Sequence, residues 1–304
     1  MKKISVIGGG TAGLLTAFTL SKGVNFEVDL YLDKNIPPQN VGEGANYTIV
    51  DEMKLHNFID GDFINKVKGT RKFGIQKTDF GGTGDFFHNF LFGNYSIHFD
   101  SELFRKYIST EYGKINIIEK NIKSLNDIDA NFKWDCRGYD HKESDNFNYM
   151  SGIPVNSTYV VQCYWDEPRF EHTKSIAMRH GWVFMIPLQD RCSVGYVYNS
   201  SISKLEDIKE DINGVFDRYN LKKSDETKAI SFKNYYRKNN FTKNTAYNGN
   251  SSFFAEPMEA TTLGNVISIA RGSINLLYGD SLLDQINERY EMLQEVAALG
   301  IDVD

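Results

Sequence analysis

The N-terminal stretch constrains the fold more than any other part of the chain. Residues 3–7 read KISVI, a short β-branched run, and the hexapeptide GGGTAG places Gly8, Gly10 and Gly13 directly after it. An apolar helical pattern then runs to Leu20. Glycines at these spacings allow a tight turn, close approach of the backbone to a pyrophosphate, and close packing of helix on strand. The order of strand, glycine turn and helix predicts a dinucleotide-binding βαβ unit.

A second predicted strand, Phe26–Leu32, completes this unit and is followed by Asp33. Asp33 comes 20 residues after Gly13, about where an acidic side chain meets ribose hydroxyls in such units. The start of the helix, at Thr11 and Ala12, offers free N–H groups and the positive end of the helix dipole to a phosphate. We therefore predict that this turn and Asp33 hold the nucleotide part of a cofactor.

Two shorter motifs extend the predicted cofactor site. Residues 42–44 read GEG, and two glycines around Glu43 suit a backbone held close to a ligand or to another strand; an ordinary loop explains this motif equally well. Asp135 and Gly138 follow the predicted strand Phe132–Trp134. A second nucleotide contact is plausible there, although the motif taken alone is better explained as a plain turn.

Composition excludes several classes of function. The chain has 304 residues, enough for one large domain or two closely joined ones, and its net charge of −6 argues against a nucleic-acid-binding protein. Its cysteines, Cys136, Cys163 and Cys192, are far apart and lack CxxC spacing, which favours a reducing compartment and predicts no metal site. Neither a signal-peptide pattern nor an apolar run of about 18 residues is present, so we expect a cytoplasmic protein without a membrane association.

The remaining chain alternates between cofactor-side and substrate-side segments. We expect one unit over residues 1–304, with cofactor segments at about 1–50, 95–145 and 245–280 and substrate-side segments at about 51–94 and 146–244. The substrate-side part turns β-rich and predicts an antiparallel sheet inserted between the cofactor segments. The further elements expected are strands at Ser96–Phe99, Ser157–Tyr164, Trp182–Pro187 and Ser193–Tyr198, a polar loop at Lys222–Thr227, and helices at Glu102–Thr110 (capped by Asp100 or Ser101), Lys204–Tyr219, about Asn265–Leu277 and Ser281–Leu299.

Lys72 and His88 are ambiguous when taken alone. Lys72 lies in the strand-like stretch RKFGIQ, and an arbitrary lysine there is best explained as a surface residue with its stem along apolar neighbours. His88 lies among aromatic residues in DFFHNF, where a histidine is more often packed in a core than catalytic.

Several stretches, in the same order and spanning roughly residues 1–270, resemble the flavin-dependent tryptophan halogenase family. GGGTAG resembles the family's flavin-nucleotide turn, NVGEGANYTI its GVGEGTxPTI, TRKFGI its TFKLGI and DCRGY its DCSGF. GWVFMIPL resembles GWxWxIPL, GYVY resembles GYVYS, and EPMEAT resembles EPLEST. The sequence departs from the family at Phe184, which replaces a tryptophan, at Ala260, which replaces a serine, and at Thr262, which replaces a glycine beside the halide.

The resemblance implies an α/β protein, namely an FAD-binding Rossmann-like domain of the flavin monooxygenase type with an inserted antiparallel β-sheet substrate region. It places Lys72 on the family's catalytic lysine and Glu259 on its catalytic glutamate; a buried structural ion pair between them is the alternative. It assigns halide binding to Thr261 and Thr262. The cofactor-binding residues predicted from the motifs and the resemblance are Gly8, Gly10, Thr11, Ala12, Gly13, Asp33, Gly42, Glu43, Gly44, Asp135 and Gly138, and the substrate-side residues are Trp182, Phe184, Ile186, Pro187 and His88.

The function implied is halogenation of a small aromatic, indole-like or phenol-like substrate. FAD reduced by a separate flavin reductase, oxygen and a halide ion would give hypohalous acid, which Lys72 positions by hydrogen bonding or holds as a haloamine. Glu259 would orient the oxidant or remove the proton from the halogenated ring. Two alternatives remain open at this point: a flavin-dependent monooxygenase or oxidase without halide use, and a non-catalytic flavin-binding protein.

Overall fold

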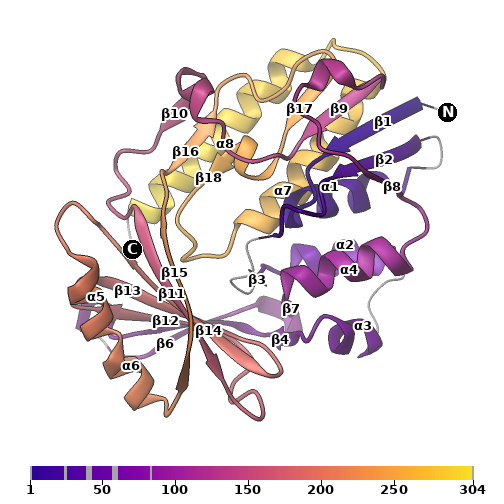
Figure 1. Cartoon of the computed structure of the whole chain (residues 1–304). Helices are drawn as coiled ribbons and strands as arrows, with labels where there is room; N and C mark the ends of the chain where they lie inside the picture. The colour runs from indigo at the N-terminus through magenta and orange to yellow at the C-terminus, as the bar shows by residue number, and fades with distance from the viewer. Residues whose placement is uncertain (1, 24–25, 39–42, 57–60, 83, 303–304) are drawn as a thin grey trace.

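A parallel sheet flanked by helices and a larger, mostly antiparallel sheet make up most of the chain in the computed structural model (Figure 1). The structure describes residues 2–23, 26–38, 43–56, 61–82 and 84–302. Two smaller sheets of three strands each accompany the two main ones. The part of the chain described contains no helix with the length and apolar character that a membrane crossing requires.

The parallel sheet carries the predicted cofactor turn. Every neighbouring pair in it is parallel, and β1 lies in the middle between β9 and β2. The carboxyl ends of these strands therefore meet at one edge, where ligands of open α/β sheets bind. Its strands, from one side to the other, are β17 (Thr245–Tyr247), β9 (Phe132–Asp135), β1 (Lys2–Ile7), β2 (Phe26–Leu32) and β8 (Asn116–Glu119).

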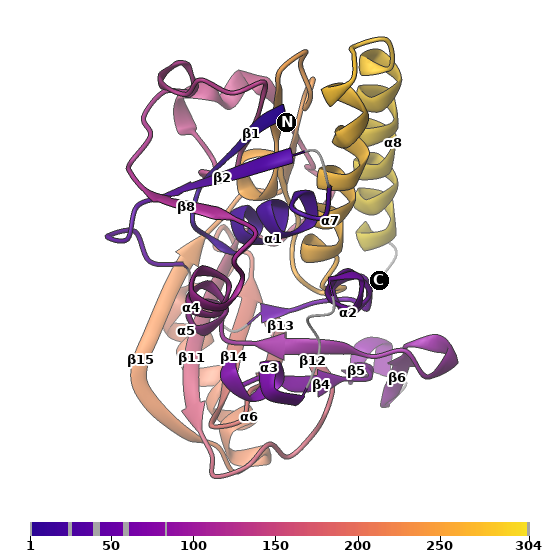
Figure 2. The same ribbon diagram turned by 90° about the vertical axis from the view of Figure 1, so that its right-hand side faces the viewer.

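Helices cover this sheet. Helix α1 (Thr11–Leu20) is buried over most of its length and packs against α7 (Thr262–Gly272) and α4 (Ser101–Glu111). Of the two predicted caps, Asp100 and Ser101, it is Asp100 that caps α4, because its carboxylate accepts the N–H groups of Glu102 at 3.0 Å and Leu103 at 2.9 Å. The other helices of this part are α2 (Thr48–Leu55), α3 (Gly61–Lys66) and α8 (Leu283–Asp302), and α8 runs beside α7 (Figure 2).

The large sheet has seven strands in the order β15-β11-β14-β13-β12-β5-β6. Strands β5 and β12 pair in parallel, and the other neighbours pair antiparallel. Its strands are β15 (Lys222–Ser231), β11 (Ser157–Tyr164), β14 (Arg191–Tyr198), β13 (Gly181–Pro187), β12 (Thr173–Met178), β5 (Gly74–Thr78) and β6 (Phe86–Asn89).

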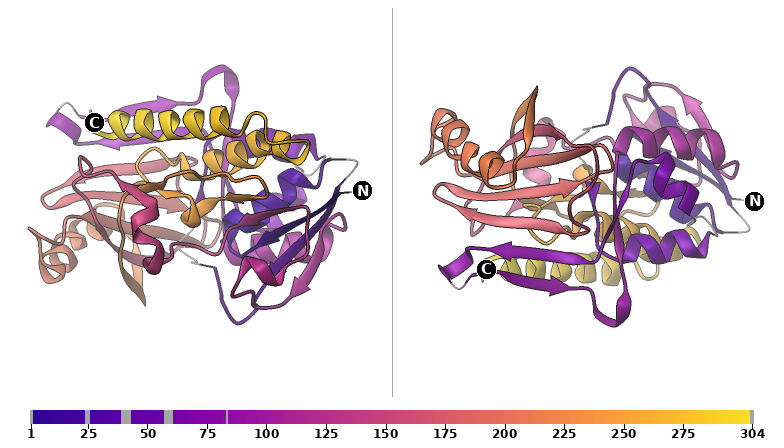
Figure 3. Two further views of the ribbon diagram at one scale, coloured as in Figure 1. Left: turned by 90° about the horizontal axis from the view of Figure 1, so that it is seen from above. Right: turned by 90° about the horizontal axis from the view of Figure 1, so that it is seen from below.

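The two faces of the large sheet pack in separate hydrophobic clusters, because side chains alternate between the faces along each strand. Val183 and Met185 pack into a core with α5 (Leu205–Asp211) and α6 (Asn213–Arg218) on the outer face, far from the parallel sheet (Figure 3). Trp182 and Phe184 belong to a separate cluster on the inner face. The inner face is the one that meets the segment before α7.

A small sheet in the order β3-β7-β4 links the two parts (Figure 1). It consists of β3 (Glu43–Gly44), β7 (Ser96–Phe99) and β4 (Thr70–Lys72), so it brings Glu43 and Lys72 to either side of β7. The second small sheet is made of β10 (Phe147–Tyr149), β16 (Tyr235–Arg237) and β18 (Phe253–Phe254).

The predicted α/β fold class is confirmed, with local corrections. The predicted loop at Lys222–Thr227 is wrong, because these residues belong to β15 at the edge of the large sheet. Most side chains of β15 are exposed, and charged side chains on an edge strand remove the apolar alternation by which a strand is recognised. The predicted helix at about Asn265–Leu277 begins earlier, at Thr262, and its last part is the 3-10 turn Ser273–Leu277.

Candidate functional site

The N-terminus of α1 is open where the sequence predicts a phosphate. Gly10 is the N-cap residue. Among the described residues, no side chain caps the helix, and a Cβ added at Gly10 would meet nothing within 4 Å. Behind the turn, Gly8 has a φ of +127°, and a Cβ there would lie 2.4 Å from the carbonyl oxygen of Cys136. The glycines thus allow the close packing of the turn. The N–H groups at the start of α1 remain available to an anion.

Glu43 lies beside the start of α1. The hydroxyl of Thr11 donates to Glu43 Oε1 at 3.3 Å, and burial raises the pKa of Glu43 to about 7. The adjacent Gly44 pairs with His98 in β3–β7, which gives the backbone contact to another strand that the motif allows. Gly42 lies outside the described residues. A carboxyl group that titrates near neutrality is thus held next to the predicted phosphate position.

Asp33 follows the carboxyl end of β2 as predicted, and its carboxylate already has local partners. It accepts hydrogen bonds from the backbone N–H of Asn35 at 2.9 Å and from the Asn121 amide at 2.7 Å. These bonds, the one from the Asn35 backbone first, hold the pKa of Asp33 below its usual value. Asp33 is therefore positioned as an ionised acceptor at the strand end, where the ribose contact is predicted.

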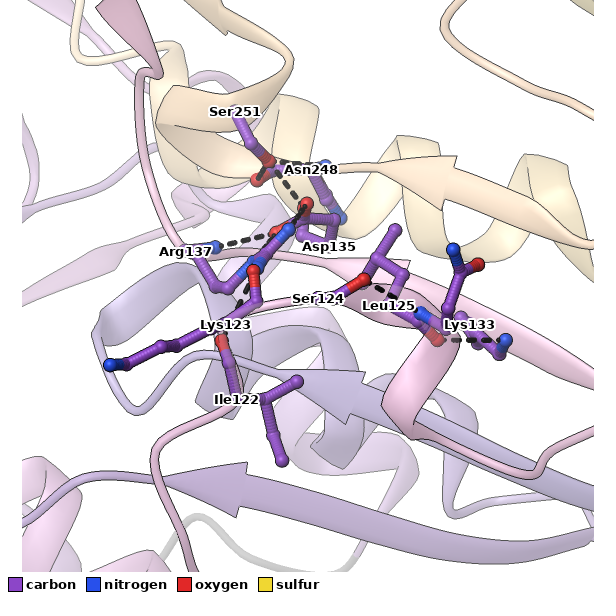
Figure 4. A network of polar contacts seen from close by, with 10 residues as sticks. Ile122, Lys123, Ser124, Leu125, Lys133, Asp135, Arg137, Asn248 and Ser251 are labelled. Carbon is purple, nitrogen blue, oxygen red and sulfur yellow. Dashed lines mark hydrogen bonds and ion pairs between the residues drawn. The ribbon is translucent and has the colours of Figure 1, made fainter.

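Asp135 joins several segments (Figure 4). Its carboxylate pairs with the Arg137 guanidinium at 2.9 and 2.7 Å, and Arg137 in turn donates to the Lys123 carbonyl at 2.8 Å. The Asp135 carbonyl accepts the N–H of Asn248 at 2.9 Å and the hydroxyl of Ser251. Asp135 thus has a structural role in connecting these segments. The cofactor contact at Asp135 and Gly138 stays a prediction. Gly138, with a φ of +104°, has open space around it.

Lys72 is the most unusual charged residue of the site. Its side chain is fully buried in β4, and Nζ has no hydrogen-bond partner among the described residues. The Phe90 ring lies near Nζ, with its centroid 5.7 Å away. Burial lowers the pKa of Lys72 to about 7, and the charge of Glu259 opposes this shift in part. Near neutrality Lys72 is therefore present as amine and ammonium in similar amounts.

Glu259 lies in the turn before α7 and does face the region of Lys72, but its direct partner is another lysine. Glu259 Oε1 is 2.8 Å from Lys77 Nζ, and Oε2 is 3.9 Å from His88 Nδ1. The Glu259 side chain is 29% exposed and that of His88 58% exposed, so this end of the site is accessible from solvent. His88 is thus not a packed core residue. Its place on the substrate side of the site stays a prediction.

Sequence reasoning missed Lys77. In one continuous strand, residues 72 and 77 would point to opposite faces because their separation is odd. The chain instead leaves the small sheet after Lys72 and enters the large sheet at Gly74. Lys72 and Lys77 therefore both act on Glu259, the first through its electrostatic influence and the second through an ion pair.

The inner face of the large sheet forms an aromatic wall beside this carboxylate. The ring centroids of Trp182 and Phe184 are 6.2 Å apart, and Ile186 continues the same face. A Cβ at Gly195 would lie 2.0 Å from the Phe184 ring, so this ring occupies the space above Gly195. Met258 packs against the same cluster and thereby fixes the residue before Glu259 to the wall.

A buried hydrogen-bond chain connects the wall to the strand of Lys72. Thr70 donates its hydroxyl to the carbonyl of Pro187 at 2.7 Å and lies 3.0 Å from His98 Nδ1. His98 Nε2 is 2.9 Å from the hydroxyl of Thr173 on β12. Burial first, and then the charge of Lys72, hold the pKa of His98 well below its ordinary value, so the imidazole is neutral.

The predicted halide residues are at the start of α7. Thr261 is the N-cap residue and Thr262 the first helical residue, and no side chain in the described part of the chain caps this end. Ala260 just before them has a φ of +51°, a left-handed conformation that is unusual for a residue with a side chain. An uncapped helix start next to Glu259 offers N–H groups to an anion, and halide binding there stays a prediction.

A cavity of about 720 Å³ opens next to the carboxyl ends of β2 and β8. Its walls include Lys34, Arg105 and Arg191 as well as Asp100. Arg191 pairs with Asp100 at 2.9 Å, a buried link between the large sheet and α4 that the sequence did not reveal. Within the described ranges, no three His, Cys, Asp or Glu side chains are grouped closely enough to hold a metal ion.

Comparison with protein families gives a match over nearly the whole chain. The model of the family described as tryptophan halogenase matches residues 3–119 and 109–298. Among curated proteins, tryptophan 7-halogenase KtzQ of Kutzneria sp. (strain 744) is 31% identical over 93 residues. That alignment spans 30% of this chain and 17% of the relative, so it covers only a small part of the relative's length.

Solved structures agree in fold. BrvH, a flavin-dependent halogenase from Brevundimonas sp. BAL3, superposes with a TM-score of 0.83 at 20% identity, covering 97% of this chain and 76% of BrvH. A flavin-dependent halogenase from Xanthomonas campestris gives a TM-score of 0.84 at 20% identity, covering 99% of this chain and 76% of the other. At this identity the likeness shows a common fold.

Proposed function

The chain belongs to the tryptophan halogenase family, and on that basis we propose that it is a flavin-dependent halogenase for a small aromatic substrate of the indole or phenol type. Bound FAD, once reduced by a separate flavin reductase, supplies the electrons with which oxygen and a halide ion give hypohalous acid. The protein's own residues bind the cofactor and the halide, hold the oxidant, and accept the proton that leaves the aromatic ring.

The residues at the start of α1 fit a dinucleotide cofactor. Gly8 and Gly13 leave no room for side chains, while Gly10 faces open space at an uncapped helix end. The pyrophosphate belongs at this helix end and the ribose near Asp33. Glu43, linked to Thr11, would contribute a hydrogen-bonding carboxyl group to the same site.

The halide belongs at the start of α7, at Thr261 and Thr262. The uncapped N–H groups and the helix dipole favour an anion there. Two hydroxyl groups add further donors. Because Glu259 precedes this helix by only a few residues, a halide bound there is close to the reacting groups.

Lys72 is the residue on which the proposal depends most. Its buried amine has no hydrogen-bond partner among the described residues and is half deprotonated near pH 7. It can hydrogen-bond hypohalous acid or react with it. In the reaction, an N–halogen bond forms, the oxygen–halogen bond breaks, and the amine proton leaves with the hydroxide as water. When the haloamine delivers the halogen to the ring, the nitrogen–halogen bond breaks, a carbon–halogen bond forms, and the nitrogen takes up a proton to become the free amine again.

Glu259 accepts the ring proton after the halogen has been added. The carboxylate is partly exposed and close to His88 and Lys77, so the substrate ring has access to it. Trp182, Phe184 and Ile186 form the wall behind this site. An apolar wall keeps water away from the oxidant on its way to Lys72.

The test is a reconstituted reaction. The purified protein is combined with FAD, NADH, a flavin reductase, oxygen and either chloride, bromide or iodide, and a panel of indoles and phenols is analysed by mass spectrometry. The expected result is a halogenated product that requires both halide and flavin. An oxygenated product formed without halide would instead identify a monooxygenase, and FAD binding without any turnover would identify a flavin-binding protein. A titration that detects no FAD binding would contradict all three functions.

A further inference from the structure

We propose that Lys77 is a positioning residue that holds Glu259 in an ion pair and thereby leaves the amine of Lys72 without a carboxylate partner. Glu259 Oε1 lies 2.8 Å from Lys77 Nζ, whereas Lys72 Nζ has no hydrogen-bond partner among the described residues. The inference rests on the proposed function, in which Lys72 reacts as a free amine.

The reaction proposed for Lys72 requires its neutral amine. A lysine attacks an electrophilic halogen only with the lone pair of its neutral form. A carboxylate in direct contact would favour the ammonium form instead, typically by one or more pKa units. An enzyme that uses both a lysine and a glutamate in one site therefore has to keep them from forming a tight ion pair.

The two lysines lie on strands of different sheets. Lys72 ends β4 in the small sheet, and Lys77 lies in β5 of the large sheet. Lys77 and the side chain of His88, which pairs with Ile75 across β5 and β6, approach the carboxylate from the large sheet. Glu259 is thus held by an ion pair from the large sheet, whereas Lys72 belongs to the small sheet.

Among the described residues, His98 on β7 and Glu259 before α7 interact electrostatically with Lys72. Lys77 forms an ion pair with the same Glu259 carboxylate. His98 is neutral and adds no charge. The charge of Glu259, partly compensated by Lys77, is therefore the main electrostatic influence that favours the ammonium form of Lys72.

The experiment measures the titration of Lys72 directly. The protein is labelled with ¹³C-lysine, the Cε resonance of Lys72 is assigned by its loss in Lys72→Met, and its chemical shift is followed from pH 5 to 10. Wild type is compared with Lys77→Met, Lys77→Gln and Lys77→Arg. Lys174→Met is the matched control, because Lys174 lies on the neighbouring strand β12, and its amine contacts Gln76 and not Glu259. Circular dichroism verifies that each variant is folded.

The expected result is a rise of about one unit in the pKa of Lys72 in Lys77→Met and Lys77→Gln. Lys77→Arg and Lys174→Met keep the wild-type titration, because arginine preserves the ion pair and Lys174 does not take part in it. Most of the shift caused by Lys77→Met must disappear when Glu259→Gln is added, since the carboxylate transmits it. An unchanged titration in Lys77→Met, or an undiminished shift in the double variant, overturns the proposal.

Turnover provides the second readout. A rise of one unit from pH 7 lowers the neutral fraction of Lys72 at pH 7 by about fivefold. Lys77→Met is expected to lose about fivefold in kcat at pH 7, to regain it near pH 9, and to keep its KM. The titration needs no flavin, halide or substrate. A positive titration without halogenation by the wild type would therefore contradict the proposed function alone, and halogenation with an unchanged titration would contradict the role of Lys77 alone.

Discussion

The hydroxyl of Thr70 donates to the carbonyl of Pro187 at 2.7 Å, across 117 residues of sequence. Thr70 lies two residues before Lys72 on β4, and Pro187 ends the strand that carries Trp182 and Phe184. The same hydroxyl lies 3.0 Å from His98. One buried threonine thus links the strand of Lys72 to the strand that carries the aromatic wall.

Thr70→Val tests this link. Valine has nearly the same shape but no hydroxyl, so the Pro187 carbonyl and His98 each lose a buried partner, at a cost of about 1–3 kcal/mol in unfolding free energy. Halogenation is expected to fall although FAD affinity stays, because only the position of Lys72 against the wall changes. Urea unfolding, FAD titration and product formation measure the three quantities. Thr70→Ser, which keeps the hydroxyl, serves as the control.

Gly8→Ala tests the cofactor turn. The added Cβ would lie 2.4 Å from the carbonyl oxygen of Cys136, and the φ of +127° is strained for alanine. We expect FAD affinity to fall by at least tenfold, which fluorescence titration would show. Gly113→Ala is the control, since a Cβ there meets nothing within 4 Å and its φ is ordinary. Equal FAD affinity in the two variants would argue against the assigned turn.

Glu259→Gln tests the proton acceptor. Glutamine keeps the size of the side chain but cannot take up the ring proton, and losing a general base costs about 10²–10⁴-fold in rate. FAD binding is expected to be unchanged, because Glu259 lies beside Lys77 and His88 and not at the start of α1. Single-turnover halogenation measures the chemical step. A rate within a factor of ten of wild type would remove Glu259 from this role.

Local patterns made the parallel sheet and the cofactor turn predictable. The sequence from Lys3 to Asp33 contains strand, glycine turn, helix and strand within about 30 residues, and the structure follows it as β1, α1 and β2. The Asp100 cap was predictable for the same reason, since a cap depends on neighbours two and three residues away. The edge strand β15 was not predictable, because its charged residues carry no apolar alternation.

The pairing inside the site could not be read from the sequence. Whether Glu259 meets Lys72 or Lys77 depends on the change of sheet between β4 and β5, and no periodicity marks that change. Arg191 and Asp100 form an ion pair although they are 91 residues apart in the sequence, and no local pattern around either residue predicts this pair. Contacts between sheets depend on packing of the whole domain, while single motifs depend on local geometry.

Lys72→Met is expected to stabilise the protein while it abolishes halogenation. The pKa of Lys72 is lowered to about 7 from 10.5, so the folded protein binds fewer protons than the unfolded chain between these pH values. The lysine therefore destabilises the fold fully below about pH 7, and the stability of wild type rises as the pH approaches 10.5. Methionine fills similar space without this penalty, and we expect a gain of about 3–5 kcal/mol at pH 6 that shrinks to about 1–2 kcal/mol at pH 9.5. Urea unfolding of both proteins at the two pH values measures the difference. A difference that does not change with pH would mean that Lys72 titrates as an ordinary lysine, which would remove the neutral amine from the mechanism.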